Sequence, residues 1–211
     1  MIDAKTFWDK AAAKYARDPI RDMAAYEYTL ERTRSYLTGQ DNVLELGCGT
    51  GSTALLLARS AGHITATDVS AKMIEIARHK SAAEGIKNIT FDEANVTGAI
   101  TGRYDTVLAF NLLHLVPDME QAIAAVHAAL AQGGHFISKS PCLGQRGAGI
   151  KGLAIRMAIP LMQAVGKAPY VRAFSIRNLE QAMLQAGFEI IESGNFPAGS
   201  PPARYIVARK R

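Results

Sequence analysis

The sequence predicts a single α/β domain built on a mainly parallel sheet, and three observations support this. Short apolar runs alternate with helical segments between residues 43 and 139, an order typical of βαβ units. The first of these runs leads into a glycine-rich turn, "VLELGCGTGS", at residues 43–52. The chain has 211 residues, and 48% of them are hydrophobic. This is enough for one domain with a sizeable core, whereas two full domains would be cramped.

Two helices are expected in the first forty residues. In "KTFWDKAAAKYA", Phe7, Ala11 and Tyr15 recur at spacings of four, which places them on one helical face. The segment "YEYTLERTRSYL" repeats that spacing. Asp18-Pro19 separates the two, because a residue before proline is driven out of the helical region.

The central part of the chain supplies the repeating strands and helices. Short apolar runs bounded by turn residues predict strands, and 3.6-residue periodicity predicts helices. Gly133-Gly134 ends the last of these helices. Strands are expected at 43–46, 63–67, 88–91, 104–110 and 135–139, and helices at 52–59, 70–83 and 117–130.

Residues 141–172 interrupt this order. A helical face there carries apolar side chains, while Lys151, Arg156 and Pro160 exclude a membrane span. The segment has three open interpretations: a cap over an apolar substrate, a dimer interface, or a helix on a membrane surface. The apolar face comprises Ile150, Leu153, Ala154, Met157 and Leu161, and Arg156, Gln163 and Lys167 fall on another face.

The chain ends with a helix at 175–186 and strands at 188–193 and 205–208. The connection between these two strands is too short for a helical crossover, so they are expected to pair antiparallel.

Composition narrows the function. The net charge is +5, but the basic residues are scattered apart from "ARKR" at the end, which disfavours a nucleic-acid partner. Two cysteines and five dispersed histidines show no metal-ligand spacing, so no metal is expected. The N-terminus is polar and unlike a signal peptide, so we expect a cytoplasmic location.

The glycine-rich turn differs from the dinucleotide fingerprint. That fingerprint has glycines at positions one, three and six, whereas Gly47, Gly49 and Gly51 occupy positions one, three and five. The turn still favours an anion at the start of a helix. Asp68 ends the next strand, about 20 residues on, where an acid holds a ribose. The expected ligand therefore carries a ribose and a small anion.

These residues resemble the class I S-adenosylmethionine-dependent methyltransferases, especially the small-molecule and quinone types. "VLELGCGTGSTALLLA" and "TATDVSAKMIEIAR" resemble the first two motifs of that family, "ITFDEANV" the third, and "YDTVLAFNLLHLVPDMEQAIAAVHAALAQGGHFISKS" the fourth. "NLEQAMLQAGFEIIE" resembles the last helix and the sixth strand. The resemblance covers residues 43–139 and 175–209.

The resemblance implies a doubly wound, Rossmann-like sheet of seven strands with an antiparallel last strand. It further implies one methyltransferase domain over residues 1–211, a helical N-terminal lid at 1–40 and a substrate cap at 141–172. The glycine-rich turn would lie under the methionine end of S-adenosylmethionine, and the anion would be its carboxylate.

The resemblance also implies a set of cofactor-binding residues. Asn95 departs from the family pattern, in which an acid contacts adenine, but its amide oxygen is still expected to accept a hydrogen bond from the exocyclic amine. For Glu45, contact with the cofactor and capping of the turn's amides are equally expected. For Asp68 the alternative to ribose binding is capping of the following helix, and for Met73 the alternative to packing on adenine is a place in the core. Cys48 is expected to be a small buried hydrophobe without a redox role. The expected set is Tyr15, Glu45, Gly47, Cys48, Gly49, Gly51, Asp68, Val69, Met73, Asn95, Val96 and Asn111.

His114 is the candidate general base, because it is the one histidine placed near the carboxyl edge of the sheet. Packing over the turn is its alternative. Trp8 and Phe7 are expected either to line the lid where it closes over the cofactor or only to dock the lid onto the domain.

The predicted function is transfer of a methyl group from S-adenosylmethionine to a small or medium, partly apolar acceptor. The alternatives are a NAD-dependent oxidoreductase, disfavoured by Ser52 at the sixth position, a non-catalytic S-adenosylmethionine-binding protein, and a methyltransferase acting on lipid or RNA. A monomer and a homodimer are both open, as is peripheral contact with a membrane.

Overall fold

A computed structural model describes residues 3–145, 158–163, 166–196 and 201–211. The strands are β1 (Asn42–Leu46), β2 (His63–Asp68), β3 (Ile89–Glu93), β4 (Tyr104–Phe110), β5 (Leu130–Pro141), β6 (Phe188–Asn195) and β7 (Ala203–Lys210). The helices are α1 (Ala4–Arg17), α2 (Met23–Arg34), α3 (Ser52–Leu57), α4 (Ala71–Ala83), α5 (Met119–Ala129) and α7 (Ile176–Gln185). Short 3-10 turns, η1 (Ala58–Ser60) and η2 (Leu113–Leu115), follow α3 and β4.

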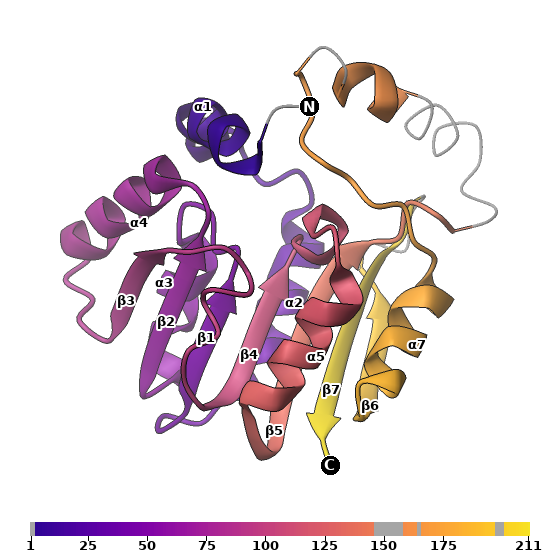
Figure 1. Ribbon diagram of the computed structural model, residues 1–211. Coiled ribbons are helices and arrows are strands. Elements are labelled where there is room, and N and C mark those ends of the chain that lie inside the picture. Colours follow the sequence, from indigo (N-terminus) through magenta and orange to yellow (C-terminus); the bar gives the residue numbers. More distant parts are fainter. Residues whose placement is uncertain (1–2, 146–157, 164–165, 197–200) are drawn as a thin grey trace.

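The strands form one seven-stranded sheet in the order β3-β2-β1-β4-β5-β7-β6 (Figure 1). The first five in this order are parallel, and β7 runs antiparallel to both β5 and β6. This confirms the predicted fold class, including the antiparallel pairing of the last two strands. The strand order reverses between β1 and β4, and open α/β sheets bind ligands at such a point, beyond the carboxyl ends of the strands.

Helices cover both faces of the sheet, and each face has its own apolar core. Helices α5 and α7 pack on one face, where Phe136 and Ile123 are fully buried. Helices α2, α3 and α4 pack on the other, around Ile64, Leu57 and Ile74. Burial of this kind stabilises the fold by about 25 cal/mol for each Å² of apolar surface removed from water. The two cores hold the strands of the sheet from both faces, and they thereby set the position of its carboxyl edge.

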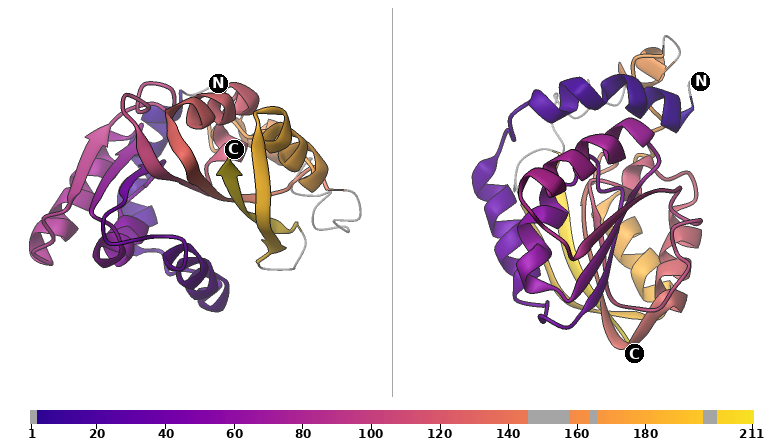
Figure 2. Two further views of the ribbon diagram at one scale, coloured as in Figure 1. Left: turned by 90° about the horizontal axis from the view of Figure 1, so that it is seen from below. Right: turned by 90° about the vertical axis from the view of Figure 1, so that its left-hand side faces the viewer.

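The first forty residues divide into two parts that do different things. Helix α2 buries Thr29, Leu30 and Thr33 and packs beside α3, so it belongs to the helical layer of the sheet. Helix α1 instead lies beside α4 and crosses the carboxyl edge (Figures 1 and 2). The expected lid is therefore narrower than residues 1–40, because the apolar face of α2 is used in the core.

The turn before β5 differs from the sequence prediction. Helix α5 ends at Ala129, and β5 begins at Leu130 rather than after the glycine pair. The pairing of β4 with β5 shifts register here, and Gly133 adopts a positive φ of 76°. A Cβ at Gly134 would lie 2.7 Å from the Asp105 carbonyl oxygen, so the glycines are needed for an irregular strand start rather than for a helix end.

Residues 158–163 are helical, and Leu161 is 70% exposed. The expected apolar face at Ile150, Leu153, Ala154 and Met157 lies outside the described residues.

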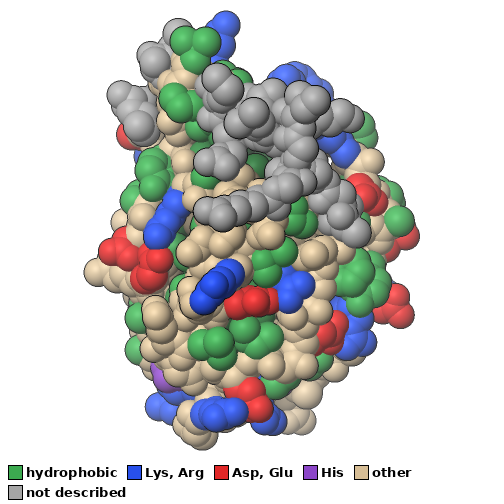
Figure 3. Space-filling model, turned by 90° about the vertical axis from the view of Figure 1, so that its right-hand side faces the viewer, with side chains coloured by type: hydrophobic (Ala, Val, Ile, Leu, Met, Phe, Trp, Pro, Cys, Tyr) green, Lys and Arg blue, Asp and Glu red, His purple; other side chains and the backbone are tan. Residues whose placement is uncertain are grey.

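On the face formed by β6 and α7, basic and acidic side chains are mixed (Figure 3). Arg204 pairs with Glu180, and Arg209 and Arg211 both pair with Glu189. This face therefore shows no field of one sign of the kind that binds nucleic acid. Among the helices of the described ranges, none has the length and apolar character needed to cross a membrane.

Candidate functional site

Two cavities meet at the carboxyl edge of β1 and β4. The first has a volume of about 410 Å³ and the second about 570 Å³. Gly47, Gly49, Tyr15, Phe110 and Asn111 line both, so these residues form the junction. Both volumes fall in the range of about 300–1,000 Å³ found for small-molecule sites.

The glycines of the turn serve different purposes. All three have positive φ, between 54° and 75°. A Cβ at Gly51 would lie 2.8 Å from side-chain atoms of Ala77 and Phe91, so this glycine lets the turn before α3 pack closely against α4 and β3. Gly51 lines neither cavity. A Cβ at Gly49 would instead point toward the Tyr15 ring, 3.7 Å from Cε1. Gly49 therefore keeps the backbone open where the cavities join.

Asp68 connects the glycine-rich turn to the start of α4. Its Oδ2 accepts a hydrogen bond from the backbone N–H of Gly49 at 2.9 Å, and its Oδ1 accepts one from the backbone N–H of Ser70 at 2.9 Å. The carboxylate also lines the first cavity. Burial raises its pKa, although the backbone donors partly offset this. Each carboxylate oxygen has a second lone pair, so Asp68 can still accept hydrogen bonds from the hydroxyl groups of a ligand.

Glu45 is a buried acid with an unsatisfied oxygen. Its side chain is 2% exposed and lines the second cavity, and its Oε2 has no hydrogen-bond partner among the described residues. Burial, with a further contribution from Asp68, raises the pKa of Glu45 to about 8. Asp68 rather than Glu45 accepts from the amide of Gly49. Because this oxygen lines a cavity, it is free to accept a hydrogen bond from a ligand group there.

The far end of the first cavity is lined by Val69, Met73, Asn95 and Val96. Met73 is 2% exposed, so it belongs to the core and also lines the cavity. The Asn95 Oδ1 accepts from the Gly98 backbone N–H at 2.7 Å and from the Thr97 hydroxyl at 3.1 Å. These two bonds use both lone pairs of the amide oxygen, so its NH₂ group is the part left to meet a ligand.

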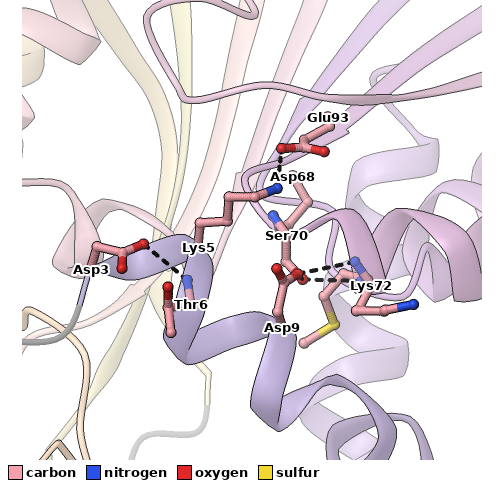
Figure 4. Close-up of polar contacts among 9 residues, drawn as sticks. Asp3, Lys5, Thr6, Asp9, Asp68, Ser70, Lys72 and Glu93 are labelled. Atoms are coloured by element: carbon pink, nitrogen blue, oxygen red, sulfur yellow. Dashed lines mark hydrogen bonds and ion pairs between the residues drawn. The ribbon is translucent and has the colours of Figure 1, made fainter.

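Helix α1 is attached over the site by polar contacts with α4 (Figure 4). The Asp9 carboxylate accepts from the Ser70 hydroxyl at 2.6 Å and from the Lys72 backbone N–H at 3.1 Å. Ser70 is also the N-cap of α4 and follows Asp68 closely in the chain. Lys5 forms an additional, exposed ion pair with Glu93. These contacts hold α1 where Trp8 and Tyr15 line the first cavity.

Asn111 has an unusual backbone conformation, with a positive φ of 53°. Its backbone N–H donates to the Lys139 carbonyl at 2.7 Å, which ties the end of β4 to β5. A non-glycine residue in this region costs of order 1–3 kcal/mol and is found more often at functional sites. The strain turns the chain at the junction of the two cavities.

His114 lies on η2 and lines neither cavity as described. Burial lowers the pKa of its imidazole to about 4, so it is neutral near physiological pH, and its Nδ1 has no partner in the described structure. Its role as general base stays a prediction. Cys48 lines the second cavity, and burial raises the pKa of its thiol well above the usual value, as expected for an unreactive hydrophobe.

The sequence reasoning missed several lining residues. Lys139 is the main one, because it lies between Ser138 and Ser140 at the end of a predicted strand and was taken as part of that strand. Its position two residues after Ile137, at the carboxyl end of β5, was the available signal. Arg21, Tyr26 and Lys80 were also missed because they come from distant elements that only the fold brings together.

Comparison with known proteins decides the family. Residues 37–166, more than half of the chain, match the family model described as "Methyltransferase domain". The chain belongs to this family. S-adenosylmethionine is the cofactor of these methyltransferases, so the expected family and cofactor are confirmed.

Individual relatives resemble parts of this methyltransferase. Over 137 residues it is 30% identical to the ubiquinone biosynthesis O-methyltransferase of Xanthomonas euvesicatoria, covering 62% of this chain and 54% of that protein. Over 120 residues it is 32% identical to the chloroplastic magnesium protoporphyrin IX methyltransferase of Arabidopsis thaliana, covering 54% and 38%. The matched part thus spans about half, or less, of these relatives.

The magnesium protoporphyrin IX methyltransferase of Synechocystis, solved with bound S-adenosylmethionine, has the same fold. The TM-score is 0.72 at 17% identity, and the match covers 100% of this chain and 99% of that one.

Proposed function

We propose that this methyltransferase transfers a methyl group from S-adenosylmethionine to a small or medium, partly apolar acceptor by in-line displacement. The observation that carries the proposal is the junction at Gly49, where an open backbone position and the Asp68 carboxylate lie between two cavities. An elongated ligand with a ribose in its middle fits such an arrangement.

The first cavity suits the adenosine half of the cofactor. Asp68 offers lone pairs to the ribose hydroxyls, and charge-assisted hydrogen bonds of this kind are strong. Val69 and Met73 supply an apolar wall for the adenine ring, and the Asn95 NH₂ group can donate to a ring nitrogen. This differs from the acceptor role expected for Asn95, since its oxygen is already used.

The second cavity suits the amino-acid half. The unsatisfied Glu45 oxygen provides a negative charge or an acceptor for an ammonium group. Thr50 of the turn and Ser52 and Thr53, the first residues of α3, line the same cavity beside the positive end of that helix, which suits a carboxylate. The residues therefore fit both ends of a zwitterion.

When bound, the cofactor supplies a methyl group activated by a sulfonium. The chain's contribution is to align the acceptor and to exclude water. Holding two reactants in line can lower the barrier by about 7–11 kcal/mol in favourable cases. Tyr15 and Trp8 on α1 close the first cavity from above, and Phe110 forms an apolar floor at the junction. His114 is proposed as the base only for an acceptor that reaches η2, because it lines neither cavity and burial lowers the pKa of its imidazole to about 4.

The class of acceptor is part of the proposal. Two of the relatives are named as a ubiquinone biosynthesis O-methyltransferase and a magnesium protoporphyrin IX methyltransferase, and the cavities here have the volume of small-molecule sites. Mixed charge on the face of β6 and α7 gives no support to RNA. Both cysteines are buried and free, which supports a reducing cytoplasm as the place of action.

Calorimetry and a turnover screen test this function together. Wild-type protein is expected to bind S-adenosylmethionine and S-adenosylhomocysteine but not NAD, and to methylate at least one phenol, quinone or organic acid in a labelled-methyl screen. Gly49→Val is expected to abolish binding while the sheet remains folded, because its branched side chain occupies the junction.

Gly39→Ala is the matched control, since a Cβ there meets nothing within 4 Å, and it is expected to bind normally. Normal cofactor binding by a folded Gly49→Val variant would show that the turn is not the site. Cofactor binding without turnover of any acceptor in the screen would favour a non-catalytic binding protein.

A further inference from the structure

Lys139 is a buried lysine that forms no ion pair with the described residues, and among these Asp22 is the one acid whose charge acts on its pKa. It stands at the carboxyl end of β5, is 9% exposed and lines the second cavity. Its Nζ donates to the Ala25 carbonyl at 3.2 Å and to the Thr29 hydroxyl at 2.8 Å. Both acceptors are neutral. The ion pairs formed by the described residues do not include Lys139.

The hydrogen bonds around the ammonium leave one proton unused. The Thr29 hydroxyl donates to the Ala25 carbonyl at 2.7 Å, so its lone pair is turned toward Lys139 and the two contacts hold the Nζ in place. An ammonium has three N–H donors, and these contacts account for two. Burial lowers the pKa of the Lys139 ammonium, and an anionic oxygen placed at the unused N–H would favour its charged form.

The surroundings describe the rest of the ligand. Tyr26, Leu30 and Phe110 line the same cavity and offer apolar and aromatic surface next to the ammonium. Arg21 and Lys80 add positive charge to the wall. The acids of the wall are Asp18 and Glu45, and in the cofactor-bound protein the proposed ammonium partner balances the charge of Glu45. The cavity thus favours an apolar body that ends in an anionic oxygen.

We infer that Lys139 binds an anionic oxygen of the methyl acceptor and so selects acidic, apolar acceptors over neutral ones. This inference rests on the proposed function and adds the substrate class to it. The backbone supports the location, because the Lys139 carbonyl accepts from the Asn111 N–H at 2.7 Å, at the junction with the first cavity. An acceptor held by Lys139 would extend from there toward the cofactor's methyl group.

Benzoate and benzamide test the inference, because they differ mainly in charge. Each is titrated by calorimetry into protein saturated with S-adenosylhomocysteine. Wild-type protein is expected to bind benzoate saturably and benzamide at least about tenfold more weakly. Lys139→Met keeps the length of the side chain and removes the charge. It is expected to lose this preference for benzoate, whereas Lys139→Arg should retain part of it.

Two further measurements separate the explanations. Affinity for S-adenosylhomocysteine should stay within about twofold in Lys139→Met, since the cofactor's own carboxylate is placed at α3. Lys87→Met, an exposed lysine that lines neither cavity, is the control and should bind both probes like the wild type. Unfolding midpoints establish that each variant is folded. If Lys139→Met does not fold, Lys139→Arg and the wild-type preference for benzoate carry the test.

Several results would overturn the inference. They are no saturable benzoate binding in the wild type, equal binding of benzoate and benzamide, and unchanged benzoate affinity in folded Lys139→Met. A loss of cofactor affinity alone in that variant would assign Lys139 to the cofactor's carboxylate instead. If the wild type binds no S-adenosylhomocysteine, the proposed function fails, and the benzoate titration on the protein alone still decides whether Lys139 binds an oxyanion.

Discussion

Asp68 performs two tasks with one side chain. Its oxygens hold the backbone of the glycine-rich turn and of the α4 start, and its remaining lone pairs face the first cavity. The two interpretations offered by the sequence, ribose binding and capping, are therefore compatible. A strand-end acid supplies the signal, but only the fold shows that the same carboxylate supports the turn.

Asp68→Ala is expected to weaken binding of S-adenosylmethionine by about 1–3 kcal/mol, through lost charge-assisted hydrogen bonds. Titration calorimetry measures the change directly. Asp92→Ala is the control, because that exposed carboxylate on β3 lines neither cavity and should leave the affinity unchanged. Unchanged affinity in a folded Asp68→Ala variant would remove Asp68 from the cofactor site.

Glu45 gives the protein a characteristic dependence of stability on pH. Its pKa of about 8 in the folded protein exceeds the ordinary value of 4.5 that applies when the chain is unfolded. Between these values the folded state holds the proton and the unfolded state does not. The contribution of this group to the free energy of unfolding is therefore fully present below about pH 4.5 and is lost as the pH rises through about 8.

Glu45→Gln removes that titration. Urea unfolding at about pH 5 and about pH 8 should show a larger fall in stability for the wild type than for the variant, by an amount of order several kcal/mol. The measurement is made without cofactor, because a bound ammonium group would favour the ionised carboxylate. The same fall with pH in both proteins would mean that Glu45 is not a buried, protonated acid.

Residue by residue, the sequence predicts the cofactor side of the site better than the acceptor side. Asp68, Met73, Asn95 and Gly49 lie within recognisable motifs, and the structure brings them to one cavity. Lys139 lies outside any motif, and its partners Ala25 and Thr29 come from a helix more than a hundred residues away. Only tertiary packing creates such a group, so local patterns do not reveal it.

Helix α1 is attached to the rest of the fold through polar contacts with α4 and β3. It contacts α4 through Asp9 and contributes one buried residue, Ala12. A segment with few buried apolar contacts opens more easily than the core. We expect α1 to move when the cofactor enters and to close over it when Tyr15 and Trp8 meet the ligand.

Asp9→Ala removes the acceptor of the Ser70 hydroxyl and of the Lys72 amide. It should weaken cofactor binding and speed proteolysis within α1, while the unfolding midpoint of the domain changes little. Lys5→Ala breaks an ion pair whose side chains are nearly half exposed, and solvent screens such pairs, so it should change neither quantity. Equal behaviour of the two variants would contradict this role for Asp9.

The sequence predicted most elements, because strong local signals coincide with the final packing. Asp118, Ser70 and Ser175 cap α5, α4 and α7 as side chains of this kind usually do. The prediction failed at β5, where Gly133-Gly134 suggested a helix end but forms an irregular strand start. The predicted lid, residues 1–40, also includes α2, which packs in the helical layer of the sheet. Periodicity alone cannot show whether an amphipathic helix packs on a sheet or over a site.

For the whole molecule, the order of the strands determines where the chemistry occurs. The reversal between β1 and β4 brings Glu45, Asn111 and Lys139 to one edge from three separate strands. Strand count and order were expected from the family resemblance, and the topology confirms them. The position of the site follows from this topology, whereas the choice of acceptor depends on side chains that differ between proteins of the same fold.

The structure of a complex with S-adenosylhomocysteine tests this assignment of the two cavities most directly. We expect the adenosine in the first cavity with its ribose hydroxyls on Asp68, the sulfur beside Gly49, and the amino-acid end in the second cavity near Glu45. The part of the second cavity beside Lys139 should remain open. A cofactor bound away from Asp68 and Gly49, or lying across Lys139, would contradict the assignment.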